Sequence, residues 1–337
     1  MIRVGILGAA GIAPQGIVRP VSRRSDMEVV AVASRSAASA RRFAKEHGIR
    51  RAYEGYAELL ADADVDLVYI ALPPSEHVGW SIAALEAGKH VLCEKPFSMD
   101  AAGARRAAAA AERAGLRLIE AFHDHYHPMI RELQRFLASG ELGAISAIKA
   151  VFTADNPFSP TSIRHVPELG GGALMDLGCY PVHWLRALGG AEPDVVSARA
   201  VLNELGADLV IDATLAFDRG PLVGAEAMLH ASMAPGVPFD ASIVITGERG
   251  QLRAENVVLP HKGHSLTSDV GGVVRSWTVA GRETYDHELD AVARAIGTGE
   301  PAATEVSDSV ATMEVIDAIY ALAGVLRPAS PSYLRSN

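Results

Sequence analysis

The chain has 337 residues, of which 49% are hydrophobic and 21% are charged, an ordinary globular mixture that excludes a disordered protein. At roughly 100–200 residues per domain, this length predicts two domains that bury real cores without help from metals or disulfides. The formal net charge of −9 argues against nucleic acid or an anionic membrane surface as a partner.

Short runs rich in Val, Ile and Leu alternate with Ala-rich amphipathic stretches over the first third of the chain. The apolar runs are typical of buried parallel strands. They are Ile2–Leu7, Val29–Ala33, Leu67–Ala71, His90–Cys93 and Leu116–Glu120. The helices predicted around them are Ala37–His47, Tyr56–Leu60, His77–Ala87 and Ala101–Ala114. This alternation predicts an α/β domain over residues 1–123, a doubly wound parallel sheet with helices on both faces.

The pattern changes after about residue 123. Helices are expected at Pro128–Ser139 and Ala173–Leu188, and two more, Tyr285–Ile296 and Ser307–Leu326, close the chain. Between Ile145 and about Arg253 the chain offers strands with turns. They are Ile145–Thr153, Val195–Leu202, Asp208–Phe217, Leu222–Met228, Ala241–Thr246 and Gln251–Ala254. Successive strands without helices predict an α+β domain over residues 124–306 with one open, largely antiparallel sheet.

The two cysteines, Cys93 and Cys179, are too few for a disulfide framework and fit a reducing compartment. The first residues lack the sections of a signal peptide, and no apolar run approaches the roughly 20 residues that span a bilayer. We therefore expect a cytoplasmic protein.

A glycine turn follows the first predicted strand. Gly8, Ala10 and Ala13 fall on the three positions of the G-x-G-x-x-G/A dinucleotide pattern, with Gly11 beside the non-glycine second position. Small residues there let the backbone approach a pyrophosphate, and Ile12 opens a helix whose free N–H groups attract phosphate. An ordinary strand-to-helix turn remains an alternative.

The end of the second predicted strand distinguishes the two nicotinamide dinucleotides. An NAD site usually has a carboxylate here for the ribose hydroxyl, whereas this chain has Ser34 and Arg35. A hydroxyl and a guanidinium suit a 2′-phosphate, which predicts NADP with NAD still possible. The alternative is an arginine that is simply solvated.

Glu94, Lys95 and Pro96 follow the strand that ends at Cys93. Ligands bind at the carboxyl ends of strands in an open α/β sheet. A lysine there can donate to a substrate hydroxyl or carbonyl oxygen, with Glu94 orienting it. A surface Glu–Lys pair before a turn is the alternative.

A second polar group follows the run Gly170–Gly172. Asp176 and Tyr180 are spaced i, i+4, so a helix places them on one face, and His183 is three residues further on. A carboxylate one turn from a phenol is a workable proton-transfer group. The alternative is an aspartate that favours the helix dipole and a tyrosine that packs in the core.

These segments together resemble the Gfo/Idh/MocA oxidoreductases. They are the glycine turn, Ser34-Arg35, Glu94-Lys95-Pro96 and the segment from Gly170 to Tyr180, in this order and spacing. The likeness covers nearly the whole chain and is nearest to the dihydrodiol dehydrogenase and NADP-dependent xylose dehydrogenase branch. It implies a Rossmann domain, a second domain whose open sheet face builds homodimers or homotetramers, and a last helix, 307–326, that returns to the Rossmann domain.

The resemblance also implies roles for residues. Lys95, Tyr180 and Asp176 would face the substrate, with His183 in reserve for Tyr180. The residues that would contact the cofactor are Gly8, Ala10, Gly11, Ile12, Ala13, Ser34, Arg35, Leu72, Pro73, His77, Glu94, Lys95 and Arg164. Pro74 stands where relatives often have Asn, which puts one cofactor contact in doubt. His123, Asp124, His125 and His127 look like metal ligands, but the implied chemistry needs no metal and none is expected.

The leading hypothesis is reversible hydride transfer between NADP(H) and a hydroxyl or carbonyl carbon of a sugar, cyclic polyol or diol. A redox-neutral, NAD-dependent glycosidase is a second hypothesis, which the apparent 2′-phosphate site disfavours. A non-catalytic NADP-binding regulatory protein is a third, and it would tolerate the loss of Lys95 and Tyr180. The substrate itself is not predicted.

Overall fold

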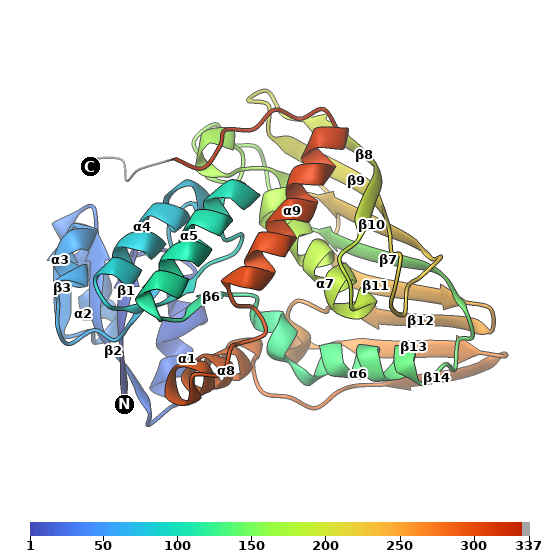
Figure 1. Cartoon of the computed structure of the whole chain (residues 1–337), viewed down its shortest axis with the longest axis horizontal. Coiled ribbons are helices and arrows are strands. Elements are labelled where there is room, and N and C mark those ends of the chain that lie inside the picture. Colours follow the sequence, from blue (N-terminus) through green and yellow to red (C-terminus); the bar gives the residue numbers. More distant parts are fainter. Residues whose placement is uncertain (332–337) are drawn as a thin grey trace. The chain divides into compact units, whose positions relative to one another are not determined.

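The computed structural model describes residues 1–331, and its contacts divide the chain into two compact units. The first unit comprises Met1–Phe122 and Tyr285–Val310, together with residues 329–331. The second comprises His123–Thr284 and Ala311–Pro328. Each unit is built around its own sheet (Figure 1).

The first sheet has the strand order β3-β2-β1-β4-β5-β6 with every pair parallel. Its strands are β1 (Ile2–Leu7), β2 (Met27–Ser34), β3 (Arg51–Glu54), β4 (Leu67–Ile70), β5 (His90–Cys93) and β6 (Leu118–Glu120). Successive residues of β4 are all buried although they point to opposite faces, so both faces of the sheet are covered. The direction of the strand order changes between β1 and β4, and ligands bind at such a switch point. The predicted Rossmann sheet is confirmed, but β3 was not predicted because it is short and half-buried.

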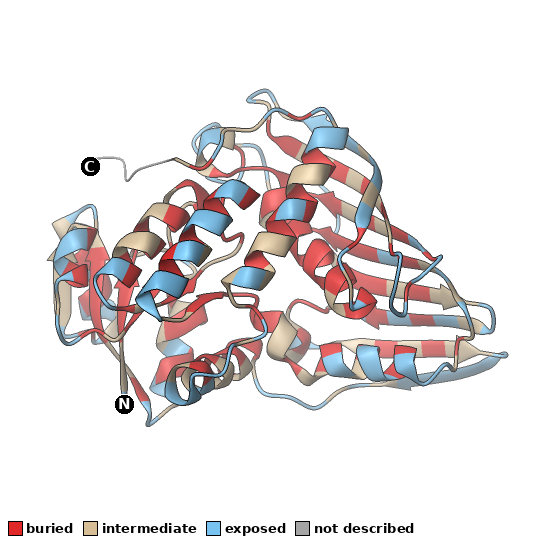
Figure 2. Ribbon diagram, in the orientation of Figure 1, coloured by how far each residue is buried: buried red, intermediate tan, exposed pale blue. Residues whose placement is uncertain are grey.

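The helices of the first unit follow the Ala-rich stretches of the sequence. They are η1 (Pro14–Val18), α1 (Arg19–Ser22), α2 (Ala37–His47), α3 (Tyr56–Leu60), α4 (Pro74–Glu86) and α5 (Ala101–Ala114). Asp100 caps α5 by accepting from the Gly103 N–H, and Gly115 ends the helix in the left-handed conformation. One stripe of α5 is buried and the opposite stripe is exposed (Figure 2), which is the amphipathic pattern of the sequence.

The two last helices are distributed differently from the expected boundaries. Helix α8 (Thr284–Thr298) groups with the first unit, because Leu289, Val292 and Ala295 join its apolar core. Ion pairs from Arg23 to Asp286 (2.6 Å) and from Arg24 to Asp290 (2.5 Å) add to this packing. The range 124–306 that was expected for the second domain therefore includes a segment, helix α8, that groups with the first unit.

Helix α9 (Val306–Leu322) groups with the first unit only up to Val310, whereas Ala311–Pro328 belongs to the second unit. This differs from the expected return of 307–326 to the Rossmann domain. The physical reason lies in two buried hydrogen bonds. Arg186 donates to the Thr312 hydroxyl (2.7 Å), and the Tyr320 hydroxyl donates to Asp208 (2.8 Å).

The second sheet has the order β14-β13-β12-β11-β7-β10-β9-β8. Its strands are β7 (Ile145–Thr153), β8 (Asp194–Leu202), β9 (Asp208–Ala216), β10 (Glu226–Ser232), β11 (Asp240–Gly247), β12 (Gly250–Glu255), β13 (Ser265–Val270) and β14 (Val273–Trp277). All neighbours are antiparallel except β10 and β7, which run parallel. The largely antiparallel sheet is confirmed.

Two details of this sheet differ from the sequence prediction. The strand expected at Leu222–Met228 is displaced to Glu226–Ser232, because Gly220 and Gly224 adopt positive φ and keep 220–224 in a turn. Strands β13 and β14 were not predicted, because they carry polar and exposed side chains. They form the edge hairpin of the sheet.

Helices cover one face of the second sheet. They are α6 (Pro128–Ala138) and, after the wide turn η4 (Leu174–Gly178), α7 (Cys179–Gly189). Short 3-10 turns, η2 (His123–Tyr126), η3 (Pro167–Leu169) and η5 (Pro260–Lys262), complete the unit. Helix α7 contacts β7 and β10 (Figure 1). Phe136 of α6 stacks on Trp277 of β14. None of the helices in residues 1–331 combines the length and apolar character needed to cross a membrane.

Candidate functional site

The turn after β1 is shaped by a glycine that no other residue can replace. Gly8 has φ of +103°, and a Cβ there would lie 2.4 Å from the carbonyl oxygen of Ala71. Its N–H donates to the Ala33 carbonyl (2.9 Å), which ties the turn to the end of β2. The turn thus stands at the carboxyl ends of β1, β2 and β4, where a dinucleotide is bound in such sheets.

The start of the following helix leaves its N–H groups without side-chain caps. Ala13 precedes η1, no acidic residue lies in the first turn, and no side chain caps it. Ala13 is fully buried against the core, Ala10 and Ile12 pack partly against the same core, and Gly11 is exposed with open space around it. Pro14 has no N–H, and the Gln15 and Gly16 N–H groups donate to the Ile12 carbonyl, so this helix start offers a phosphate the positive end of its dipole.

Ser34 ends β2, and Arg35 follows it at the same edge of the sheet. Ala33 pairs with Leu7 in the parallel register, so the two residues stand beside the Gly8 turn. Arg35 is exposed, and its charge opposes the rise that burial causes in the pKa of Tyr56. The residues described at this strand end supply a hydroxyl and a guanidinium, a donor set suited to a phosphate.

His77 joins the turn after β4 to the turn after β5. Leu72 and Pro73 form the first turn, and Pro74 begins α4. The His77 side chain is buried, with Nε2 2.7 Å from the Leu72 carbonyl oxygen and Nδ1 3.0 Å from that of Pro96. Burial lowers the pKa of His77 to about 4, so the ring is neutral and donates its single N–H to one of these carbonyls. This histidine packs between the two turns and hydrogen-bonds the backbone of one of them.

Lys95 lies two residues after the end of β5, next to the carboxyl group of Glu94. The Glu94 carboxylate accepts a hydrogen bond from the Tyr69 hydroxyl of β4. Burial raises the pKa of Glu94, and the hydrogen bond and the Lys95 charge oppose that rise. Lys95 itself is half-buried at the switch-point edge. A Cβ at Gly16 would lie 2.4 Å from the Tyr69 hydroxyl, so this glycine, which the sequence pattern did not single out, makes room for the pair.

In the second unit, the glycine run 170–172 lets the chain approach a buried carboxylate. A Cβ at Gly172 would lie 2.1 Å from Oδ1 of Asp208, and Gly172 has φ of +135°. The other oxygen of Asp208 accepts the Leu174 N–H (2.7 Å), and Tyr320 donates its hydroxyl to Oδ1. Burial raises the pKa of Asp208, and these hydrogen bonds oppose the rise. Asp208 therefore fixes the start of the segment that carries Asp176 and Tyr180.

Asp176 lies in η4, a π-helical turn, rather than in a regular α-helix. Its Oδ2 accepts from Nε of Arg164 at 2.9 Å, with 22% of the Asp176 side chain and 50% of the Arg164 side chain exposed. The sequence suggested Arg164 as a contact for cofactor or substrate. The structure pairs it with the aspartate, which holds the carboxylate in one orientation, and its contact with cofactor or substrate stays a prediction. Wide turns of this kind are frequent at functional sites.

Tyr180 is 5% exposed, and its hydroxyl oxygen lies 3.3 Å from Nε2 of His123. Phe152 of β7 packs edge-on against the Tyr180 ring with centroids 5.4 Å apart. His183, the reserve candidate, is 2% exposed, and its ring faces that of His125 at 4.9 Å. The sequence marked His123 only as a possible metal ligand, and nothing in its spacing signalled a bond to a residue 57 positions away.

The histidine-rich segment 123–127 does not form a metal centre in the described chain. Within residues 1–331, no group of three or more His, Cys, Asp or Glu side chains is arranged to hold a metal ion. Asp124 accepts from the Trp184 indole, and His127 caps α6 by accepting the Met129 N–H (3.2 Å). Burial raises the pKa of Asp124 to about 6.

Comparison with known proteins decides the family. Residues 2–122 match the model of the oxidoreductase family with an NAD-binding Rossmann fold, and residues 130–253 match the Gfo/Idh/MocA C-terminal domain. The chain belongs to the Gfo/Idh/MocA oxidoreductases. It is 36% identical over 325 residues to an uncharacterised oxidoreductase of Rhizobium meliloti, covering 95% of this chain and 96% of the relative.

Two further relatives have named activities or ligands. A D-xylose 1-dehydrogenase (NADP(+)) of Haloferax volcanii is 35% identical, covering 94% of this chain and 95% of the relative. The crystal structure of KijD10, a 3-ketoreductase from Actinomadura kijaniata in complex with NADP and TDP-benzene, is similar with a TM-score of 0.87 and 29% identity. That match covers 95% of this chain and 97% of the other.

This family member is an NAD(P)-dependent dehydrogenase or reductase that acts on CH–OH groups. The first unit fits its dinucleotide cofactor, because the Gly8 turn stands at the switch point of the sheet and open space surrounds Gly11 in that turn. The expected family resemblance and reaction type are thus confirmed.

Proposed function

We propose that this oxidoreductase prefers NADP(H) and acts on a hydroxyl or carbonyl carbon of a sugar or a related polyol. Lys95 and Tyr180 move the hydroxyl proton, and Asp176 orients the substrate. The position of Lys95 carries the proposal, since it follows β5 at the sheet edge that bears the Gly8 turn. The nicotinamide, when bound, supplies the hydride acceptor or donor.

The roles of the other residues follow from their chemistry. Gly8, Ala10, Gly11, Ile12 and Ala13 form the pyrophosphate turn. Ser34 and Arg35 bind the 2′-phosphate. Leu72, Pro73 and Glu94 line the nicotinamide end, where His77 packs between the two turns. Arg164 acts on the substrate side through its ion pair with Asp176.

The substrate class is supported by the named relatives. They include a D-xylose dehydrogenase, trans-1,2-dihydrobenzene-1,2-diol dehydrogenases and several nucleotide-sugar 3-reductases. The structures of KijD10 include variants with a lysine replaced by alanine and a tyrosine replaced by phenylalanine, residue types that match Lys95 and Tyr180.

A cofactor absorbance assay tests the proposal directly. Purified protein is offered NADP⁺ or NADPH with a panel of aldoses, polyols, diols and keto sugars, and turnover is followed at the reduced nicotinamide band. We expect Lys95→Ala to lower kcat by about 1,000-fold while NADPH still binds. A wild-type rate in that variant removes Lys95 from the chemistry, and cleavage of aryl glycosides without net reduction indicates the glycosidase instead.

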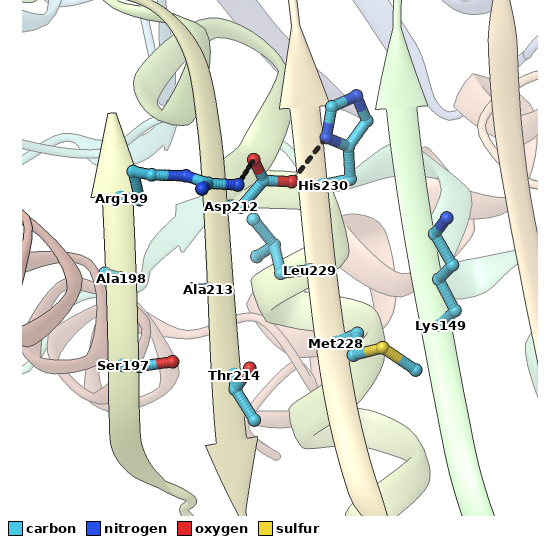
Figure 3. Close-up of a pocket in the computed structure, with 10 residues that line it drawn as sticks. All are labelled: Lys149, Ser197, Ala198, Arg199, Asp212, Ala213, Thr214, Met228, Leu229 and His230. Carbon is cyan, nitrogen blue, oxygen red and sulfur yellow. Dashed lines mark hydrogen bonds and ion pairs between the residues drawn. The ribbon is translucent and has the colours of Figure 1, made fainter. Parts of the chain in front are cut away.

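We also propose that the chain forms a homo-oligomer through the open face of the second sheet. Figure 3 shows this face, where Lys149 (β7), Met228 and His230 (β10), Asp212 (β9) and Arg199 (β8) project from neighbouring strands. They line a shallow pocket of about 430 Å³. Asp212 pairs with His230 (2.8 Å) and Arg199 (3.7 Å), and Arg199 is 83% exposed, so both charge signs are available to a second copy.

Light scattering on the purified protein measures the mass against 35.5 kDa for one chain. We expect a multiple of that mass, and a smaller species for Met228→Glu combined with Arg199→Glu. Lys45→Glu, on the exposed side of α2, makes a similar charge change away from this face and serves as the control. A monomeric wild-type protein contradicts this part of the proposal.

A cytoplasmic location is proposed as well, since Cys93 and Cys179 are buried thiols that form no disulfide.

A further inference from the structure

The phenol of Tyr180 needs somewhere to send its own proton. A tyrosine has an ordinary pKa of about 10, so at neutral pH it carries its proton and can accept another only by giving the first away. One partner in place is His123, whose Nε2 lies 3.3 Å from the Tyr180 oxygen. His123 and Tyr180 are 4% and 5% exposed, so bulk water does not readily take that proton.

We propose that His123 is a positioning and proton-relay residue that acts through Tyr180. In the oxidation direction the substrate C–H bond breaks and its electron pair leaves with hydrogen to the oxidised cofactor. The substrate O–H proton moves to the Tyr180 oxygen, the phenol proton moves to Nε2 of His123, and the carbonyl forms. The products are a carbonyl compound, the reduced cofactor, a neutral tyrosine and an imidazolium, and reduction reverses each step. The inference rests on the proposed function of Tyr180.

The geometry holds His123 in place for this exchange. It lies in η2, and the next residue, Asp124, accepts a hydrogen bond from the Trp184 indole of α7. Trp184 follows Tyr180 by four positions, so η2 and α7 are joined at two successive points on one helix face. The rings of His123 and Tyr180 meet edge-on with centroids 6.0 Å apart, which aims the nitrogen at the hydroxyl.

The titratable groups packed around the pair lie on η2 and α7. On the same element as His123, Asp124 is fully buried, and burial raises its pKa to about 6. The charge of His183 on α7 opposes that rise. His125 on η2 and His183 on α7 are the other titratable groups of this cluster, and they face each other. Phe152 of β7 packs edge-on against the Tyr180 ring and adds no titratable group.

Substitution by glutamine separates a relay from mere packing. His123→Gln keeps a side chain of similar length that can hydrogen-bond to the phenol but cannot store a proton. We expect kcat to fall by about 30-fold with KM within about twofold and with unchanged thermal stability. His264→Gln is the matched control in the same unit. His264 accepts the Val279 N–H (2.8 Å) and bonds the Pro260 carbonyl through its other nitrogen (2.8 Å), and the kcat of its variant should stay within about twofold of wild type.

A double-variant cycle tests whether His123 acts through Tyr180. In a Tyr180→Phe background, His123→Gln should cause no further loss of kcat, because the phenol that it serves is absent. Equal losses in both backgrounds, or a wild-type kcat and pH profile in His123→Gln, overturn the relay.

A second readout does not depend on turnover. In the whole protein with tyrosine labelled at Cζ with ¹³C, the Tyr180 resonance is assigned by its absence in Tyr180→Phe. We expect its shift to show a step where His123 titrates, and we expect His123→Gln to remove that step. Absence of the step in wild type overturns the pairing even if the enzyme is active. If no substrate of the panel is turned over, the proposed function fails, and a surviving step then reports a structural hydrogen bond, which overturns the relay.

Discussion

The helices that begin at Pro14 and Leu174 both open with a wide π turn, but the two units prepare these turns in different ways. In the first unit, the turn before the helix is shaped by backbone against backbone, with Gly8 pressed on the Ala71 carbonyl and no side chain at the helix start. In the second, the helix start is held by Asp208, 34 residues away from Leu174, which Tyr320 in turn holds.

The difference has a chemical reason. The first helix start has no carboxylate beside it and follows a turn with open space around Gly11, so a phosphate can approach, whereas a start already capped by a carboxylate repels one and serves to place the side chains that follow it. The first unit thus offers backbone groups to a cofactor. The second offers side chains, Asp176 and Tyr180, each fixed by a partner from elsewhere in the unit, Arg164 and His123.

The largest expected effect is on cofactor binding, and it tests the backbone contacts that shape the Gly8 turn of the first unit. Gly8→Val places a branched side chain 2.4 Å from a carbonyl oxygen at a φ of +103°, so the turn must shift. We expect the Kd for NADPH to rise by about 1,000-fold, on the order of 4 kcal/mol. Fluorescence titration measures it, with circular dichroism to check the fold. Gly11→Ala is the control, since open space surrounds that position, and a comparable loss there would contradict the steric account.

The next largest effect is on stability, and it tests the side-chain contacts of Asp208 that hold the helix start in the second unit. Asp208→Ala leaves the Leu174 N–H and the Tyr320 hydroxyl without their acceptor in a site that is 1% exposed. We expect the free energy of unfolding of the second unit to fall by about 3 kcal/mol, measured in urea. Tyr320→Phe removes only one of the two bonds and should cost about 1 kcal/mol. Equal losses in the two variants would mean that the Leu174 bond contributes nothing.

The stability contributed by the buried side chain of Asp124, also in the second unit, should depend on pH. Its folded pKa is raised to about 6, above the value of 3.8 for an exposed aspartate. The neutral form is therefore favoured by folding, and this contribution is present at low pH and is lost as the pH rises through about 6. Asp124→Asn keeps an oxygen for the Trp184 indole but removes the titration. Between about pH 4 and pH 6 the wild type should lose on the order of 2 kcal/mol relative to the variant, measured by urea unfolding. Parallel pH curves would contradict the raised pKa.

The smallest expected effect is on the preference for NADPH over NADH, and it tests the role of Arg35. Arg35 is exposed at the end of β2, where water screens its charge. We expect Arg35→Ala to raise the Kd for NADPH by about tenfold, on the order of 1.4 kcal/mol, and to leave the Kd for NADH nearly unchanged. Equal weakening for both cofactors would show that Arg35 does not act on the 2′-phosphate.

Patterns of short range predicted most of the regular structure. Helices α2, α3 and α5 and strands β1, β5 and β7 begin and end at the predicted residues, because capping residues, glycines and apolar periodicity are local signals. Strands β13 and β14 escaped prediction because their stability comes from pairing with neighbours rather than from an apolar sequence.

The sequence by itself predicted the cofactor-binding turns of the first unit. It could do so because each turn is a short local pattern, a strand end followed by glycines or by a helix start, whose residue types indicate what they bind. It also named Lys95, Asp176 and Tyr180. Only the tertiary structure decided which partner each side chain of the second unit has, and it placed α8 with the first sheet. Hydrogen bonds such as those of Tyr180 with His123 and of Asp208 with Tyr320 join residues 57 and 112 positions apart, and no local pattern encodes such a pairing.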